Sequence, residues 1–228
     1  MKNKNINLNT QRACGIAIFS ALAYVVAFVC NIIPPVAGFL SLDVKDAIIT
    51  VAAFAYGPIS ALIISFIAAL IELVTFSTTG WYGFVMNFIS SSVFSVTASL
   101  IYSKRRSLNG ALIGLYSAVM ATTAVMLLMN LIVTPWYLVY IGLPIAVARG
   151  EVMTLLPIVL LPFNFSKALL NSATVMLLYK PLTLALSRIG IGAKSKGSIK
   201  WGKSSYIILG AGLASATVAL AILLVLWL

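Results

Sequence analysis

The sequence predicts an all-α integral membrane protein, and three observations lead to this prediction. Of its 228 residues, 62% are hydrophobic and only 8% are charged, whereas about a quarter of the residues in soluble domains are charged. The apolar residues also gather in long runs, and a helix needs roughly 20 of them to cross a bilayer. This composition excludes a soluble globular protein and a disordered chain. The length leaves room for about six or seven spans and for no sizeable soluble domain.

The individual helices follow from the apolar runs and from the residues that interrupt them. Pro34 and Pro35 end the first run, because proline cannot continue a helix. Gly57-Pro58 predicts a tight turn after a short second run, and residues 77–83 (STTGWYG) and 135–150 are expected to form connections. The expected helices cover residues 13–33, 47–56, 59–76, 84–102, 111–134, 152–179 and 206–228.

The C-terminal part of the chain differs in composition from the rest. Residues 190–205 are basic and rich in Gly and Ser, which is typical of a linker. The predicted organisation is therefore a membrane domain (1–189), a linker (190–205) and an additional transmembrane helix (206–228). Small residues in that last helix provide a surface for close helix packing, at Gly210/Ala214 or at Gly212/Ala216.

The basic residues predict the orientation in the membrane. With the N-terminus in the cytoplasm, most of the 15 Lys and Arg residues fall on the inner side and only Lys45 and Arg149 on the outer side. The positive-inside rule favours this arrangement. The net charge of +11 is then mainly a signal of topology, and nucleic acid is not an expected partner. We expect a multi-pass protein of the cell membrane, with its C-terminus outside if 206–228 also spans.

Several kinds of chemistry are unexpected in this chain. It contains no His, which removes His-based general bases, haem ligation and most zinc sites. It has no G-x-x-x-x-G-K-[ST] phosphate loop, so we expect no ATP hydrolysis by that route. With only four acidic residues, an intramembrane enzyme is a poor fit. We expect no catalytic residue, no metal ion and no cofactor.

One polar stripe in the sixth apolar run is the strongest candidate for a site. Asn164, Lys167 and Asn171 lie at positions i, i+3 and i+7, within about 60° of one another on a helix. Because polar groups inside a bilayer are costly, they mark function by default, and we expect the stripe to line a ligand cavity. The alternative is that the two Asn side chains join helices and Lys167 pairs with Glu72.

Further polar residues fall near the same side of the bundle. Asn130 and Asn87 add carboxamides, which both donate and accept and so suit a uracil-like edge. Asp43, Lys45 and Asp46, in the expected loop 36–46, suit the hydroxyls of a polyol, or belong to a solvated loop with local ion pairs. Separately, small residues recur every four positions on the first helix and permit close helix approach, within the protein or to a partner; they are Ala13, Ala17 and Ala21.

Five segments carry a resemblance to a known family. They are LSLDVKDAI, YGPISALIISFIAALIE, FSTTGWYGFVMNF, MNLIVTPWY and LLPFNFSKALLN. In this order and spacing they resemble the riboflavin-specific S components of energy-coupling factor (ECF) vitamin transporters, over about residues 10–188. The resemblance implies a six-helix bundle that binds the vitamin near the extracellular face. It also implies two kinds of partner, a transmembrane T component and two cytoplasmic ATPases.

The resemblance also assigns roles to individual positions. Asn130, Asn164 and Lys167 match motif residues that contact the flavin or its ribityl chain. Asp43 and Asp46 match the loop that caps the vitamin, and Asn87 matches a further motif position. The ridge of Ala13, Ala17 and Ala21 matches the pattern by which such helices meet the T component. Riboflavin would then be a transported ligand rather than a cofactor.

The segment 206–228 departs from the six-helix pattern of that family. Two other functions stay open beside riboflavin capture: an S component for another vitamin, or a stand-alone ion-coupled carrier. Carriers of that kind use inverted repeats and several ionisable groups within the membrane. Here the apolar runs hold only Glu72 and Lys167 as charged groups, without an evident repeat.

Overall fold

A computed structural model gives the structure of residues 2–188 and 203–227, with side chains described for 10–178 and 206–227. All its regular secondary structure within these ranges is helical, apart from an isolated bridge between Val36 and Leu40. The helices are α1 (Lys2–Cys30), α2 (Lys45–Tyr56), α3 (Pro58–Thr75), α4 (Gly80–Lys104), α5 (Leu108–Tyr140), α6 (Ile145–Leu155), η1 (Leu156–Leu160), α7 (Leu161–Arg188) and α8 (Lys203–Trp227).

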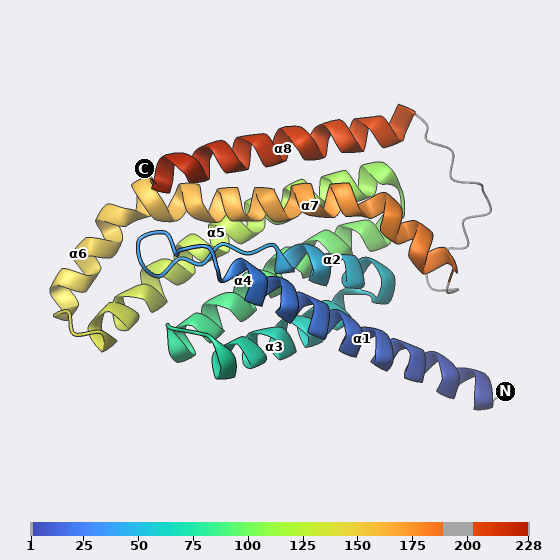
Figure 1. The fold of residues 1–228 in the computed structure, drawn as a ribbon, viewed down its shortest axis with the longest axis horizontal. Helices are drawn as coiled ribbons and strands as arrows, with labels where there is room; N and C mark the ends of the chain where they lie inside the picture. The colour runs from blue at the N-terminus through green and yellow to red at the C-terminus, as the bar shows by residue number, and fades with distance from the viewer. Residues whose placement is uncertain (1, 189–202, 228) are drawn as a thin grey trace.

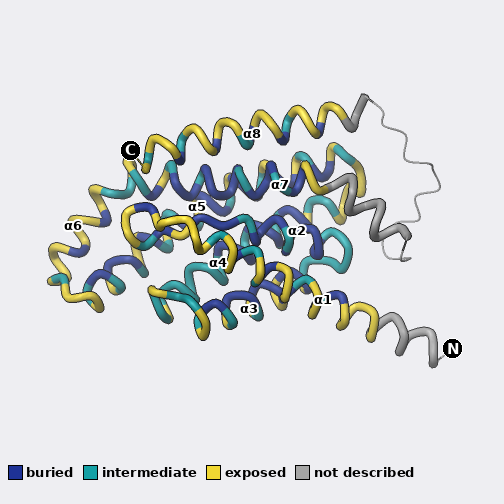
Figure 2. Tube along the Cα trace, in the orientation of Figure 1, coloured by how far each residue is buried: buried dark blue, intermediate teal, exposed yellow. Residues whose placement is uncertain are grey.

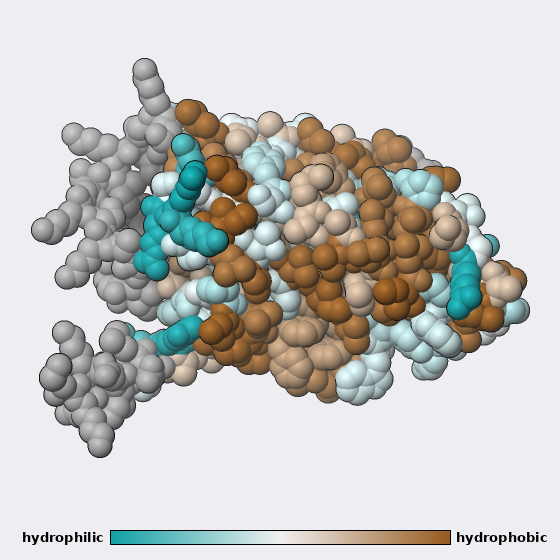
Figure 3. Space-filling model, turned by 180° about the vertical axis from the view of Figure 1, so that it is seen from behind, coloured by the Kyte–Doolittle hydropathy of each residue, from teal (hydrophilic) through white to brown (hydrophobic). Residues whose placement is uncertain are grey.

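The helices run roughly side by side in one elongated bundle (Figure 1). The short helix α2 lies at its centre, in contact with α1, α3, α4 and α7. The outer helices bury one side and expose the other, as Figure 2 shows along α8. Apolar residues cover the middle of the surface in Figure 3, and hydrophilic residues lie toward the two ends. Six helical segments within the described residues are long and apolar enough to cross a membrane.

The turn between α2 and α3 forms where the sequence predicts it. Gly57 has a φ of 93°, a conformation that glycine adopts without strain. Pro58 then occupies the first turn of α3, where its missing N–H has no helical acceptor anyway. At this turn the chain changes direction between the 12-residue α2 and α3. Lys45 and Asp46, in the first turn of α2, are both buried.

The expected connection over 135–150 is wrong, because helix covers most of it. Helix α5 continues through Pro135 to Tyr140, and α6 begins at Ile145. Pro135 leaves one carbonyl without its helical donor, but within a bilayer an open loop would leave many more groups unpaired. Two further prolines, Pro157 and Pro162, lie at the wider turn of η1. There the Leu161 N–H donates to the carbonyl of Leu156.

The C-terminal transmembrane helix predicted at 206–228 is present as α8, which starts at Lys203. It packs along α7, on the side of the bundle away from α1 and α3 (Figure 1). Two pairs of small residues on α8 were candidates for close packing. Gly212, of the second pair, is buried, whereas Gly210 and Ala214, the first pair, are exposed. The linker prediction falls mainly on residues 189–202, which lie outside the described residues.

Candidate ligand-binding site

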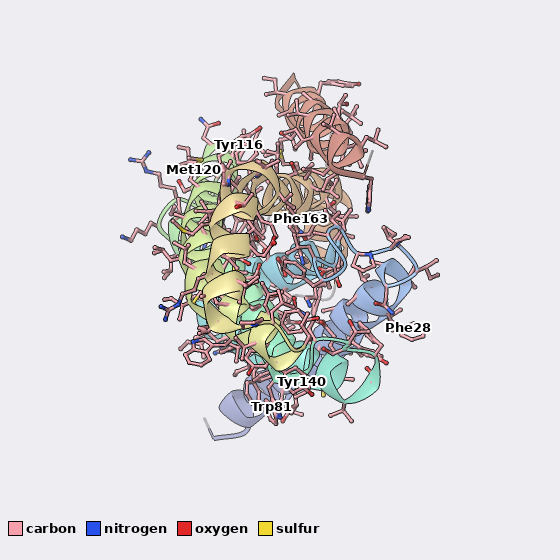
Figure 4. All side chains as sticks on the ribbon, turned by 90° about the vertical axis from the view of Figure 1, so that its left-hand side faces the viewer. Phe28, Trp81, Tyr116, Met120, Tyr140 and Phe163 are labelled. Atoms are coloured by element: carbon pink, nitrogen blue, oxygen red, sulfur yellow. The ribbon has the colours of Figure 1, made fainter. Side chains whose placement is uncertain are left out.

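A cavity lies between the first turns of α4 and α7 and the second half of α5, covered by the loop 31–44. Its apolar and aromatic wall residues are Phe39, Leu40, Tyr82, Met86, Met126, Val133, Tyr137 and Phe163. Viewed from the α6 end, Phe163 lies near the centre of the bundle (Figure 4). The polar residues of the wall are Ser41, Thr79, Asn87, Ser90, Asn130, Thr134, Asn164 and Lys167. A concave site that combines apolar and aromatic side chains with polar groups is typical of small-molecule sites.

Two carboxamides face this cavity from neighbouring helices. Nδ2 of Asn130 donates to the Met126 carbonyl at 2.7 Å, and Nδ2 of Asn164 donates to the Leu160 carbonyl at 2.7 Å. Oδ1 of Asn130 accepts from the Thr134 hydroxyl at 2.9 Å. No described residue donates to Oδ1 of Asn164, so that oxygen is open to a ligand. The bonds to the helix backbone fix both amides in place.

Lys167 joins the cavity to the loop that covers it. Its Nζ lies 2.8 Å from Oδ2 of Asp43 and donates to the Ser41 carbonyl at 3.1 Å. The Asn171 side chain, one turn further along α7, donates to the Asp43 carbonyl at 3.0 Å and accepts from the Ala47 N–H at 2.9 Å. Asn171 therefore does not line the cavity; it fixes the start of α2 against α7.

A second buried ion pair lies beside the first. Nζ of Lys45 contacts both carboxylate oxygens of Glu72 at 2.6 Å and lies 3.9 Å from Oδ2 of Asp43. Nδ2 of Asn87 donates to the same Glu72 carboxylate at 3.0 Å. The alternative in which Lys167 pairs with Glu72 is therefore wrong. The solvated-loop alternative is wrong as well, because Asp43, Lys45 and Asp46 are all buried.

Comparison with known proteins places this fold in a family. Residues 14–179 match the family described as ECF transporter, substrate-specific component. The chain is an ECF transporter S component. The protein named riboflavin transporter RibU in Staphylococcus aureus (strain TCH60) is 30% identical over 191 residues, covering 82% of this S component and 100% of that protein. The riboflavin transporter RibU of Streptococcus thermophilus is 26% identical over 184 residues, with 79% and 87% covered.

A solved structure supports the same assignment. It is titled "Structure and mechanism of the S component of a bacterial ECF transporter" and matches with a TM-score of 0.63 at 29% identity. The match covers 79% of this chain and 99% of that one. Family membership, together with the apolar helices, makes this S component a multi-pass membrane protein. Helix α8 begins at Lys203, beyond the range that matches the family.

The structure brings four of the six expected ligand-binding residues of this S component together on one cavity wall. They are Asn87, Asn130, Asn164 and Lys167. Asp43 instead lines a smaller polar pocket beside it, which shares Ser41, Thr79 and Asn87 with the main cavity. Asp46 lines neither pocket; it accepts a hydrogen bond from the Ser91 hydroxyl inside the bundle. The first turn of α2 draws Asp46 toward α4 and away from the cavity.

Sequence reasoning missed two kinds of residue in this S component. The first is Lys45, whose burial was not foreseen. A basic residue between apolar runs is indistinguishable from a solvated loop charge until its partner Glu72 is known. The aromatic and Met side chains of the wall were not singled out, since they are equally ordinary on a lipid-facing surface. Their shared signal is position: Tyr82, Met86 and Ser90 follow one another at helical spacing on α4.

The small-residue ridge of the S component points away from its own bundle. Ala13, Ala17 and Ala21 are all exposed on α1, whereas Gly15, Ala23 and Ala27 are buried. Gly15 is needed there, because a Cβ at this position would overlap the ring of Tyr56. The ridge therefore does not pack internally, and it is open to lipid or to another protein.

Proposed function

We propose that this S component binds riboflavin in the cavity and acts as the substrate-binding subunit of an ATP-driven ECF transporter. One observation carries the proposal: Asn130, Asn164 and Lys167 meet on the wall of a cavity that also presents aromatic and Met side chains. The names of the two RibU relatives support the choice of vitamin.

The chemistry of riboflavin suits this wall. The uracil-like edge of the flavin both donates and accepts, as the carboxamide of Asn164 does. The dimethylbenzene end needs apolar walls, which Phe163 and the Met side chains supply. The ribityl hydroxyls suit Lys167, whose ammonium has three donors, two of them used by Asp43 and Ser41. In this proposal Asn87 and Asp43 lie at the polar end, and Asp46 acts only by holding α2 in place.

The size of the cavity indicates that binding moves the covering loop. Its volume is about 90 Å³, whereas pockets for drug-sized ligands measure about 300–1,000 Å³. The loop 31–44 is the part of the wall without helical structure over most of its length. We propose that it shifts outward as the vitamin enters, since most of the remaining wall is formed by helices packed against one another.

The partners belong to the same proposal. Uptake would need a T component and two ATPase subunits, because this chain has no phosphate loop of its own. The exposed ridge of Ala13, Ala17 and Ala21 offers the T component a surface for close helix packing. The charge distribution supports a cytoplasmic N-terminus. Because α1 begins at one end of the bundle and α8 ends at the other (Figure 1), the same arrangement puts the C-terminus outside.

An ion-coupled carrier is less well supported. Such a carrier needs an intramembrane acid that exchanges its cation, and Glu72 is held by both Lys45 and Asn87. An S component for a different vitamin differs from our proposal only in the ligand. The other-vitamin alternative predicts a protein that binds no flavin, whereas the carrier alternative predicts uptake without ATPase partners.

The deciding experiment is an absorption and fluorescence spectrum of the full chain purified in detergent. We expect flavin absorption bands with quenched fluorescence, and free riboflavin after denaturation. A colourless protein that also fails to quench added riboflavin would overturn the choice of ligand. Binding of another vitamin would then keep the S-component role, whereas ion-driven uptake without ATPase partners would replace it.

A further inference from the structure

A second concave surface lies on the outside of the bundle, next to the ligand cavity. It is a groove of about 420 Å³ between α4 and α5, lined by Trp81, Tyr82, Val85, Ile132, Val133 and Trp136. Its two indoles are open, with Trp81 68% and Trp136 56% exposed. In the view of Figure 4, Trp81 and Tyr140 both lie toward the same edge of the bundle. The groove therefore offers two large aromatic faces on one open surface.

The groove and the cavity share a wall. Tyr82 and Val133 line both of them, one residue from each helix. The ring of Tyr82 meets Tyr137 edge-on at a centroid distance of 6.0 Å and lies 5.8 Å from the ring of Tyr140. A half-buried aromatic side chain thus separates the open groove from the enclosed cavity.

The position of the groove favours a ligand that arrives from the water–membrane boundary. Trp81 is the second residue of α4, and Trp136 lies four residues before the end of α5, about 6 Å along the helix axis. Indoles are enriched at this boundary. A lipid chain would meet aliphatic side chains equally well anywhere on the bundle, whereas aromatic faces here continue through Tyr82 and Tyr137 toward Phe163.

We propose that the groove of Trp81, Tyr82, Val85, Ile132, Val133 and Trp136 is an outer stacking subsite for the planar ring system of the transported ligand. The ring docks against the indoles first and then passes Tyr82 into the cavity. This subsite rests on the proposed function, because it assumes that the ligand is a planar aromatic molecule. It is occupied only on the way in and out, so it affects rates and leaves the equilibrium affinity unchanged.

The test is stopped-flow quenching of riboflavin fluorescence by the full chain in phosphatidylcholine nanodiscs. The variants are Trp81→Leu and Trp136→Leu, with Trp227→Leu on α8 as the matched control for an exposed Trp. We expect each groove variant to slow association at least about fivefold, as loss of one stacking contact implies. Dissociation should slow by the same factor, so that Kd is unchanged. Trp136→Phe keeps an aromatic face and should restore most of the rate.

Each other outcome has a definite meaning. Association at the wild-type rate in both Leu variants would overturn the subsite and leave the groove to lipid. Faster dissociation with unchanged association would also overturn it, because the indoles would then act on the bound state. If the wild-type chain quenches no riboflavin at all, the proposed ligand fails, and the stacking subsite for it fails as well. Quenching with unaffected variants removes the subsite alone.

Discussion

At the scale of single residues, the unusual feature is a group of five charged side chains buried inside a membrane bundle. Asp43, Lys45, Asp46, Glu72 and Lys167 are each less than 9% exposed. Isolated charges are not stable there, but paired and hydrogen-bonded ones are. Lys167 contacts the cavity and the covering loop at once. Ligand contact and loop position therefore depend on the same ammonium group.

Loss of polar groups from the cavity wall should weaken riboflavin binding. Asn164→Ala and Lys167→Ala each remove a group that faces the ligand, and hydrogen bonds of this kind contribute roughly 1–3 kcal/mol. We expect Kd to rise about tenfold or more in each variant, measured by quenching of flavin fluorescence. Asn109→Ala, at an exposed Asn on α5, is the control. Wild-type affinity in both cavity variants would contradict the site assignment.

The ion pair of Lys45 and Glu72 should act on stability. Lys45→Met leaves a buried carboxylate with Asn87 alone, and loss of one partner of a buried pair typically destabilises by about 3–5 kcal/mol. The double variant Lys45→Met/Glu72→Gln removes both charges and should recover part of this loss. Thermal unfolding in detergent measures the effect, with Lys104→Met at an exposed Lys as control. Equal unfolding temperatures for the Lys45 and Lys104 variants would show that the pair is not formed.

At the scale of helices, α8 lies beyond the range that matches the family and packs against α7. The backbone at Gly212 approaches α7 closely: a Cβ there would lie 3.3 Å from Cβ of Met176 and 3.4 Å from the Ala173 carbonyl. The Tyr116 and Ser215 hydroxyls are 3.0 Å apart. Leu223, near the end of α8, belongs to the same buried apolar cluster as Phe163 of the cavity wall. Helix α8 thus stabilises the helix that carries Asn164 and Lys167.

Two glycines of α8 provide a matched test of this packing. A Cβ at Gly212 already lies within 3.4 Å of α7, so Gly212→Leu has to push α8 away from α7. A Cβ at Gly210 has no neighbouring helix within 4 Å. Both changes raise helix propensity by a similar amount, so their difference reports packing alone. Overpacking typically destabilises by about 1–3 kcal/mol. We expect Gly212→Leu to unfold at a lower temperature than Gly210→Leu in the same detergent. The reverse order would show that α8 does not pack through Gly212.

At the scale of the whole molecule, the sequence predicts what depends on composition and local signals. The spans, the Gly57-Pro58 turn and the C-terminal helix are of this kind, and so is the polar stripe of α7. The helical structure over most of 135–150 was missed because Pro135 normally ends a helix, while the surrounding membrane favours continuing it. The burial of Lys45 and Asp46 was missed because it depends on Glu72 and Ser91, which lie far away in the chain.

Two surfaces of small residues are exposed, and they lie on opposite sides of the bundle. One is the ridge of Ala13, Ala17 and Ala21 on α1; the other is Gly210 and Ala214 on α8, which packs along α7 (Figure 1). The cavity lies between them, and neither surface contributes a residue to its wall. Partner binding at the ridge and ligand binding in the cavity are therefore separable by mutation.

A bulky residue on the ridge should abolish uptake without affecting the ligand. Ala17→Phe fills the surface on which we propose that the T component packs, and this residue is remote from the cavity wall. We expect ATP-driven riboflavin uptake in cells to be lost, with an unchanged Kd for riboflavin in detergent. Ala214→Phe places the same bulk at an exposed Ala of α8 and should leave both uptake and affinity at wild-type values. Normal uptake by the Ala17 variant would exclude the ridge as the coupling surface, and loss of uptake in the Ala214 variant would place a partner on α8 instead.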